Sequence, residues 1–152
     1  MSTDPLARLP DGFLQYQYQM LGIADFLTRP DVTEICINRP GEVYLETPAG
    51  WQCMPVAGLT PERVRHFCTT IVNESNTGQR ITAAEPLVSL TFPSGQRAQF
   101  IIPPAVEAER ISTTIRLPSR QPPSLEQYAA QGFFDQLAPQ TQRLSSQDRQ
   151  LL

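Results

Sequence analysis

Two arginines, Arg97 and Arg116, are the residues whose type and spacing could do chemistry. Both lie in the segment Pro93–Arg116, which reads PSGQRAQFIIPPAVEAERISTTIR and places them at matching positions on two short strands around a proline-bearing loop. A guanidinium group is a planar fork of donors that keeps its charge, so such a pair suits an anionic oxygen cluster such as a phosphate. The pattern predicts a phosphate-contacting site at these two residues.

The sequence lacks the rest of a nucleotide site. It contains no GxxxxGK[ST] loop, and all twelve basic residues are arginine, so a P-loop lysine is absent. Residues 77–123 hold three acidic residues and five arginines, whereas residues 1–76 hold nine acidic residues and five arginines. The formal net charge of −3 argues against nucleic acid as the main partner. We interpret the chain as the arginine-supplying half of a site whose other half lies elsewhere.

The three cysteines, Cys36, Cys53 and Cys68, fit neither a disulfide framework nor a zinc motif, because their number is odd and their spacing scattered. We expect three buried thiols in a reducing compartment. The N-terminus has no apolar signal sequence, and no apolar run approaches the roughly 18 residues of a membrane span. These features predict a cytoplasmic protein.

The remaining titratable side chains favour ordinary surface roles. His66 lies outside the apolar stripe of its predicted helix and has no partner at a meaningful spacing. Glu34 and Glu46 lie on different predicted strands without a nucleophile or metal partner nearby in sequence. Like Glu42 and Glu85, they are predicted to be surface carboxylates. The sequence therefore predicts no catalytic residue and no metal site.

A hairpin and a third strand must position the arginines. The hairpin joins the strand Leu87–Phe92 to the strand Arg97–Ile102 through a Pro-Ser-Gly-Gln turn, and Ile111–Leu117 is the third strand. Their alternation places both arginines on the more polar faces.

The N-terminal half predicts a helix followed by three strands. Phe13–Leu27 has a helical apolar pattern, although Gly22 weakens it. The residues expected on its apolar face are Phe13, Tyr16, Met20, Ile23, Ala24 and Leu27. The strands Thr33–Asn38 and Val43–Thr47 flank a Pro-Gly type II turn, and Trp51–Pro55 follows, with Trp51 expected to cover the sheet edge or core.

The segment Thr60–Asn73 is the clearest helix in the sequence. Thr60 is a suitable N-cap, and proline and glutamate follow at the first helical positions. Its apolar residues recur at helical spacing and form one stripe. They are Val64, Phe67, Cys68, Ile71 and Val72.

A linker is predicted to begin at Pro118. Ser124 and Gln127 form a capping box for a short helix through Ala130, with Gly132 as its stop. The aromatic pair Phe133-Phe134 then predicts docking onto another domain. The last residues resemble a helix N-terminus interrupted in mid-pattern, so we expect the chain to be a piece of a longer protein.

Several of these segments together resemble the N-terminal domain of the hexameric traffic ATPase of bacterial type IV secretion systems. That family belongs to the secretion ATPase superfamily, which also includes the type II secretion and type IV pilus motors. Five stretches match in the expected order over roughly residues 20–150. They are Val32–Tyr44 (VTEICINRPGEVY), Pro86–Ser89 (PLVS), Gly95–Gln99 with Pro103-Pro104, Ile111–Ser119 (ISTTIRLPS) and Tyr128–Phe134 (YAAQGFF).

The resemblance implies an α+β, PAS-like fold with an antiparallel sheet and flanking helices, followed by a linker and the start of a further helix. Residues 1–117 would be the ring-forming N-terminal domain, and residues 118–152 would lead to an absent C-terminal RecA-like ATPase domain. The full-length parent would be a homohexameric ATP hydrolase that uses ATP with Mg²⁺, and Arg97 and Arg116 would contact its nucleotide. The fragment alone is expected to bind no cofactor and to hydrolyse nothing.

The resemblance also implies partners and a location. The partners would be the protein's own ATPase domain, neighbouring subunits, and other secretion ATPases or inner-membrane components, without direct contact to nucleic acid. The location would be cytoplasmic and peripheral to the inner membrane. Two other classes stay open. One is a stand-alone adaptor that scaffolds a secretion complex without touching nucleotide, and the other is a PAS-like sensor, which needs an apolar pocket.

Overall fold

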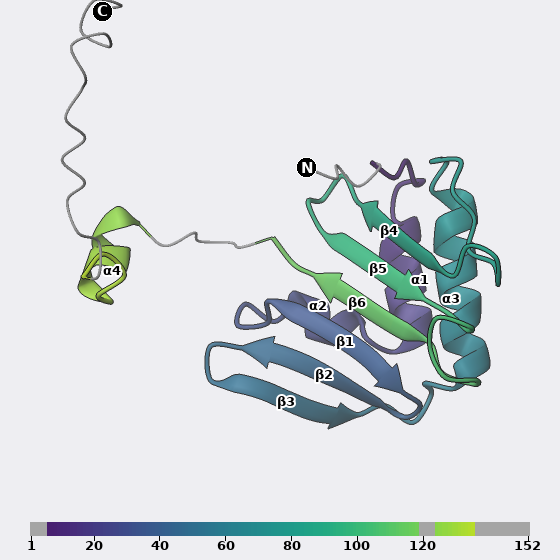
Figure 1. The fold of residues 1–152 in the computed structure, drawn as a ribbon, viewed down its shortest axis with the longest axis horizontal. Helices are drawn as coiled ribbons and strands as arrows, with labels where there is room; N and C mark the ends of the chain where they lie inside the picture. The colour runs from purple at the N-terminus through teal and green to yellow at the C-terminus, as the bar shows by residue number, and fades with distance from the viewer. Residues whose placement is uncertain (1–5, 119–123, 136–152) are drawn as a thin grey trace, which may run out of the picture. The chain divides into compact units, whose positions relative to one another are not determined.

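A six-stranded antiparallel sheet with three helices forms the first of two units in the computed structural model, which describes residues 6–118 and 124–135 (Figure 1). The units are Met1–Arg120 and Gln121–Leu152. The strand order is β3-β2-β1-β6-β5-β4. The strands are β1 (Glu34–Arg39), β2 (Glu42–Thr47), β3 (Gly50–Pro55), β4 (Leu87–Thr91), β5 (Arg97–Ile101) and β6 (Ser112–Arg116). The helices of this unit are α1 (Phe13–Leu21), α2 (Ala24–Thr28) and α3 (Pro61–Glu74). The predicted α+β class is confirmed.

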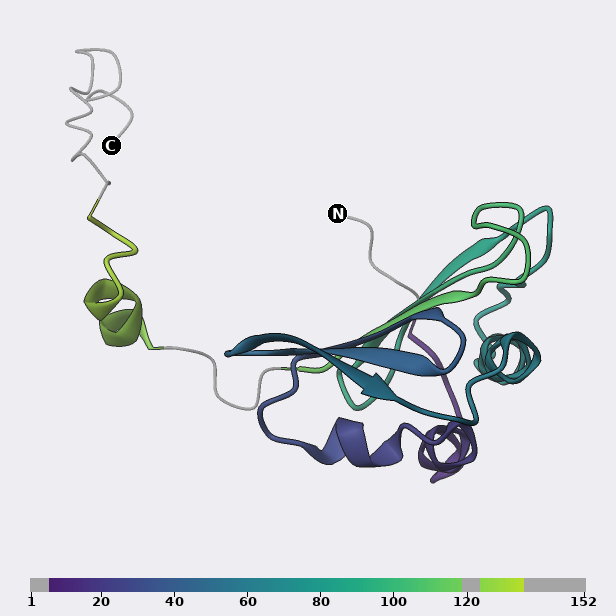
Figure 2. The ribbon, with the colours of Figure 1, turned by 90° about the horizontal axis from the view of Figure 1, so that it is seen from below.

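The three helices cover one face of the sheet and leave the other face open. Figure 2 shows α1, α2 and α3 on the same side of the strands. The burial pattern agrees, because buried and accessible residues alternate along β1, β2, β4, β5 and β6. The core therefore lies between the helices and one sheet face, and the opposite face, which we call the open face, is free to carry polar side chains.

Helix α3 forms as its sequence predicts. The Thr60 hydroxyl accepts a hydrogen bond from the backbone N–H of Arg63, and the five apolar residues of the predicted stripe are all buried. The Phe67 ring lies 6.0 Å from the ring of Tyr18 on α1 and 5.9 Å from that of Phe100 on β5. These aromatic contacts join two helices to the strand that begins with Arg97.

The predicted helix Phe13–Leu27 is two helices, so this prediction was wrong. Gly22 adopts a left-handed conformation with φ +82° and ends α1, and α2 begins at Ala24. The break changes the buried face. Tyr18 is 2% exposed, whereas Tyr16 and Met20, which we expected to face the core, are 55% and 53% exposed.

The hairpin between β1 and β2 has the predicted turn. Gly41 has a φ of +81°, as the third position of a type II turn requires, and Arg39 pairs with Glu42 across it. The next strand, β3, is an edge strand of the sheet. Trp51 on β3 is 55% exposed, so it lies at the sheet edge and does not cover the core.

The second unit contains helix α4 (Leu125–Ala130). Ser124 and Gln127 form the predicted capping box, and Gly132 follows the helix with a φ of +74°. The ring of Phe133 lies 5.2 Å from that of Tyr128 and 5.4 Å from that of Phe134. The last residues, which resemble a helix N-terminus, lie outside the described residues.

Candidate functional site

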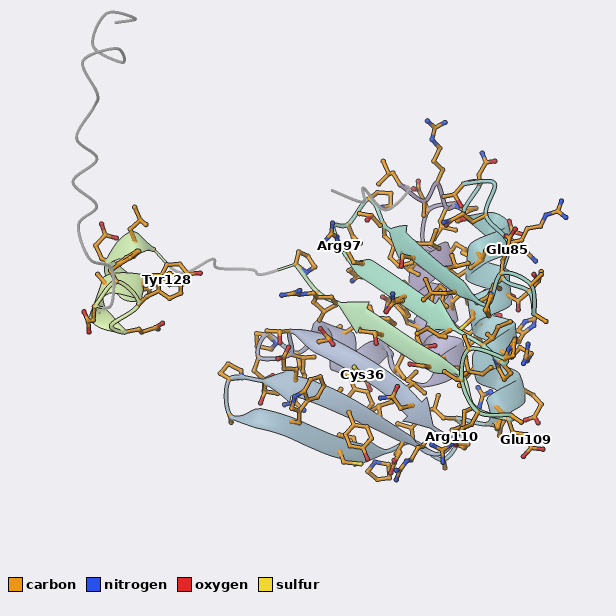
Figure 3. All side chains as sticks on the ribbon, viewed as in Figure 1. Cys36, Glu85, Arg97, Glu109, Arg110 and Tyr128 are labelled. Carbon is orange, nitrogen blue, oxygen red and sulfur yellow. The ribbon has the colours of Figure 1, made fainter. Side chains whose placement is uncertain are left out.

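The two arginines are direct neighbours across adjacent strands. Arg97 of β5 and Arg116 of β6 are register partners, and both are exposed (Figure 3 labels Arg97 at the start of its strand). Side chains of directly opposed residues leave the sheet about 4.5–5.5 Å apart on the same face. Both side chains project from the open face, since Ala98 and Ile115 beside them are buried in the core. The structure therefore brings together the two residues that the sequence singled out.

A charged row crosses the open face at this level of the sheet. The register places Thr91, Arg97, Arg116, Glu34, Glu46 and Trp51 in line from β4 to β3. The row holds two cationic residues side by side and then two anionic ones. Like charges that oppose each other across strands destabilise a sheet, and only the middle pair, Arg116 and Glu34, is an attractive neighbour pair. Two cationic side chains side by side create a local positive charge that would attract an anionic group.

Two side chains hold the acidic end of the row. The Thr33 hydroxyl donates to Oε2 of Glu46 at 2.8 Å, and the Cys36 thiol donates to Oε1 of Glu34 at 3.4 Å. The carboxylates that the sequence placed on separate strands are thus cross-strand neighbours. Both carboxylates are half-buried, and among the described residues no group of three or more His, Cys, Asp or Glu side chains could hold a metal ion.

The cysteines do not form the three buried thiols that we expected. Cys68 is buried, Cys36 is half-buried and Cys53 is exposed on the edge strand β3. Burial raises the pKa of Cys68 to about 12 and that of Cys36 to about 11. Both groups therefore stay protonated at neutral pH, and a thiolate nucleophile is excluded at these two positions.

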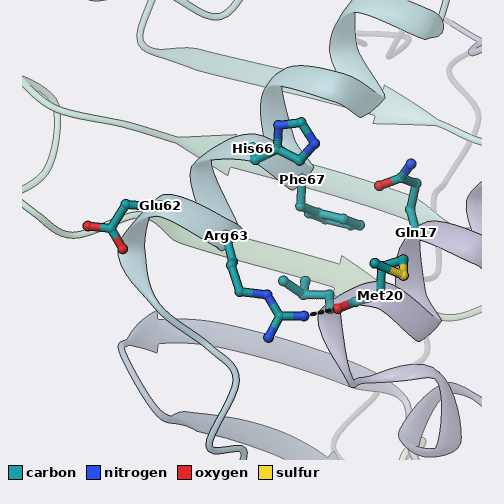
Figure 4. Close-up of a pocket in the computed structure, with 7 residues that line it drawn as sticks. Gln17, Met20, Glu62, Arg63, His66 and Phe67 are labelled. Atoms are coloured by element: carbon teal, nitrogen blue, oxygen red, sulfur yellow. Dashed lines mark hydrogen bonds between the residues drawn. The ribbon is translucent and has the colours of Figure 1, made fainter.

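The helix layer contains a separate hollow of about 220 Å³ (Figure 4). Its walls come from α1 and α3, with Met20, Leu21 and Phe67 as the apolar part. Arg63 beside it donates hydrogen bonds to the carbonyl oxygens of Met20 and Gly58, so its guanidinium ties the end of α1 to α3. The hollow is smaller than the roughly 300–1,000 Å³ of most ligand pockets, and it lies on the opposite side of the sheet from the arginine pair.

Sequence reasoning missed the surroundings of the arginines. It did not place Glu34 beside Arg116, because the pairing of β1 with β6 joins segments almost 80 residues apart. Alternation along Thr33–Asn38 does assign Glu34 to the polar face, but alternation gives a face and not a register. It also missed the hydrogen bond from Tyr18 to Gln96, the residue before Arg97.

Comparison with known proteins identifies the relatives of this fold. The chain is 38% identical over 127 residues to the type IV secretion system protein VirB11 of Brucella suis, and 31% identical over 112 residues to the type IV secretion system protein PtlH of Bordetella pertussis. The crystal structure of the Brucella suis VirB11 ATPase in complex with sulphate superposes with a TM-score of 0.68 at 35% identity. The chain matches the N-terminal domain of a VirB11 ATPase. No protein-family model matches it.

The match to VirB11 covers most of this chain but only part of its relatives. It spans 84% of the chain and 35% of Brucella suis VirB11, and 74% of the chain and 32% of PtlH. The structural match covers 91% of the chain and 40% of the crystallised VirB11. The chain thus spans about a third of the length of these relatives. Its described part contains no helix with the length and apolar character needed to cross a membrane.

Proposed function

We propose that this chain is the N-terminal, ring-forming domain of a type IV secretion ATPase and that Arg97 and Arg116 bind the terminal phosphate oxygens of ATP. Residues 1–117 form the domain, and residues 118–152 connect it to a RecA-like ATPase half. The observation that carries the proposal is the arginine pair on adjacent strands of the open face. Two guanidinium groups at this spacing supply several donors to one phosphoryl group.

The relatives and the chemistry of the pair support this proposal. The VirB11 structure that shares the fold is a sulphate complex, and sulphate is a tetrahedral oxyanion like a phosphoryl group. ATP brings Mg²⁺ with it, and a bound metal would neutralise charge on the β- and γ-phosphates. The P-loop and the metal ligands then come from the ATPase half, while this chain adds positive charge from the opposite side. Domain closure would depend on the bound nucleotide.

The proposed assembly is a homohexamer at the cytoplasmic side of the inner membrane. Its contacts would include its own ATPase half, neighbouring subunits, and other secretion ATPases or inner-membrane components. The exposed aromatic residues after α4 support such docking, since Phe133 is 68% exposed in the second unit. The alternative is an adaptor that scaffolds the complex without touching nucleotide.

The test is ATP turnover by the full-length protein, with this chain joined to its ATPase half. Arg97→Ala and Arg116→Ala should each lower kcat/KM by about 10-fold or more, because a hydrogen bond to a charged group contributes about 1.5–3 kcal/mol. Arg110→Ala is the matched control, since Arg110 lies in a loop and pairs with Glu107 at 2.9 Å. Unchanged turnover in both variants would refute the nucleotide role. Normal secretion by the same variants would then favour the adaptor.

A further inference from the structure

The hairpin turn before Arg97 is held from inside the fold by a buried tyrosine. The Tyr18 hydroxyl of α1 donates a hydrogen bond of 2.8 Å to Oε1 of Gln96, the residue immediately before Arg97. Tyr18 is 2% exposed. Burial raises the pKa of its hydroxyl far above the usual range, so the group keeps its proton and remains a donor.

The Gln96 backbone closes the same turn. Its carbonyl accepts from the Phe92 N–H at 2.8 Å, and the Gly95 N–H donates to the Phe92 carbonyl at 2.8 Å. Gln96 is thus fixed by its backbone at the base of the hairpin and by its side chain against α1. Successive side chains of a strand point to opposite faces, so a Gln96 side chain held toward the helices directs Arg97 to the open face.

The turn also lies close to the chain just after the strand that carries Arg116. A Cβ atom on Gly95 would lie 3.5 Å from Cβ of Pro118, so the turn passes this proline with space for about one methyl group between them. Pro118 is two residues beyond Arg116. The turn therefore leads into the strand of Arg97 and lies close to the residue two positions beyond Arg116.

A hollow beside the turn offers the Gln96 side chain a second position. This hollow has a volume of about 300 Å³ and is lined by the segment before α1 and by the turn, with Tyr18 and Gln96 among its walls. Without the Tyr18 hydroxyl, the Gln96 amide can rotate toward the hollow and bond to water there. The turn then loses its internal anchor while the hydrophobic core keeps the aromatic ring.

We propose that Tyr18 is a positioning residue that acts through Gln96 to hold Arg97 opposite Arg116 for phosphate binding. The inference rests on the proposed nucleotide role of the arginine pair. The Tyr18 ring also packs against Phe67, which packs against Phe100 of β5. The tyrosine therefore belongs to the core through its ring and to the site through its hydroxyl, and removal of the hydroxyl alone separates the two roles.

The experiment compares Tyr18→Phe with Tyr16→Phe in the full-length protein. Tyr16 lies on the same helix and is 55% exposed, so its variant makes the same chemical change away from the turn. Tyr18→Phe should lower kcat/KM for ATP hydrolysis by about 2- to 10-fold, the loss expected for one hydrogen bond. Tyr16→Phe should leave it unchanged. Gln96→Ala removes the same bond from its other partner and serves as the second variant if Tyr18→Phe does not fold.

A double-mutant cycle with Arg97→Ala decides whether the effect runs through that arginine. If Tyr18 positions Arg97, adding Tyr18→Phe or Gln96→Ala to Arg97→Ala produces no further loss of kcat/KM. An equal loss in both backgrounds would show a general structural effect and overturn the inference, as would unchanged turnover in both single variants. If Arg97→Ala and Arg116→Ala both leave turnover unchanged, the proposed function fails. If only Arg97→Ala has no effect, Tyr18 has no functional arginine to position, and this inference alone fails.

Discussion

The charged row on the open face makes a quantitative prediction about the substitution Glu34→Arg. Neighbouring strands lie about 4.8 Å apart, so unit charges on adjacent strands interact by about 0.9 kcal/mol in water, and charges two strands apart by about 0.4 kcal/mol. In the wild-type row, attraction to Arg116 offsets repulsion from Glu46, and the more distant attraction to Arg97 remains. Reversal of the charge at position 34 inverts all three interactions.

The expected cost of Glu34→Arg is about 0.6–0.9 kcal/mol at about 10 mM salt, where the Debye length of about 30 Å leaves these charges nearly unscreened. At about 0.5 M salt the Debye length is only a few ångströms, and the cost should fall below about 0.2 kcal/mol. The salt dependence follows from the position of the row on the solvent-accessible face of the sheet.

The assay is urea unfolding of this chain at the two salt concentrations. Glu85→Arg makes the same change in net charge on the loop before β4, away from the row, and is the matched control (Figure 3). Subtraction of its effect isolates the row. The reasoning fails if Glu34→Arg costs no more than Glu85→Arg at low salt, or if its cost is equally large at high salt, because a buried pair would be screened much less.

Two further predictions concern local stability and the thiols. Thr60→Ala should lower the free energy of unfolding by about 1 kcal/mol, because α3 loses its N-cap. Thr60→Ser keeps the hydroxyl and should change this free energy little. Equal effects of the two substitutions in urea unfolding would refute the capping role. A thiol reagent at neutral pH should modify Cys53 first, and Cys68 only on unfolding. The folded-state pKa values of Cys36 and Cys68 are raised to about 11 and about 12. The free energy of unfolding should therefore fall as pH rises above the ordinary thiol pKa of 9.0, because only the unfolded state loses these protons there. A free energy of unfolding that stays constant from about pH 8 to 11 would contradict this prediction.

Local sequence patterns predicted most of the helices and strands, because the residues that define each element lie close together in the sequence. The α3 stripe, the Pro-Gly turn before Glu42 and the capping box at Ser124 each depend on residues within a few positions of one another. Gly22 shows the limit of such patterns. The apolar spacing continues through it, but a residue in the left-handed conformation ends a helix whatever pattern surrounds it.

The candidate site was only partly predictable, because it depends on long-range register. Alternation placed Arg97 and Arg116 on polar faces, but the loop between their strands does not determine which residues oppose each other. A register shift of one residue would have turned one arginine toward the core. The bond between Tyr18 and Gln96 joins residues 78 positions apart and has no sequence signature at all.

The strand order has a consequence for how the domain is made. The two central strands, β1 and β6, come from opposite ends of the first unit, and β6 is the last strand to be synthesised. Before β6 is synthesised, β1 and β5 lack the strand that lies between them in the finished sheet. Strand β6 therefore joins the two halves of the sheet and brings Arg116 to Arg97. A chain that ended before β6 would lack both the link between the two halves of the sheet and one arginine of the candidate site.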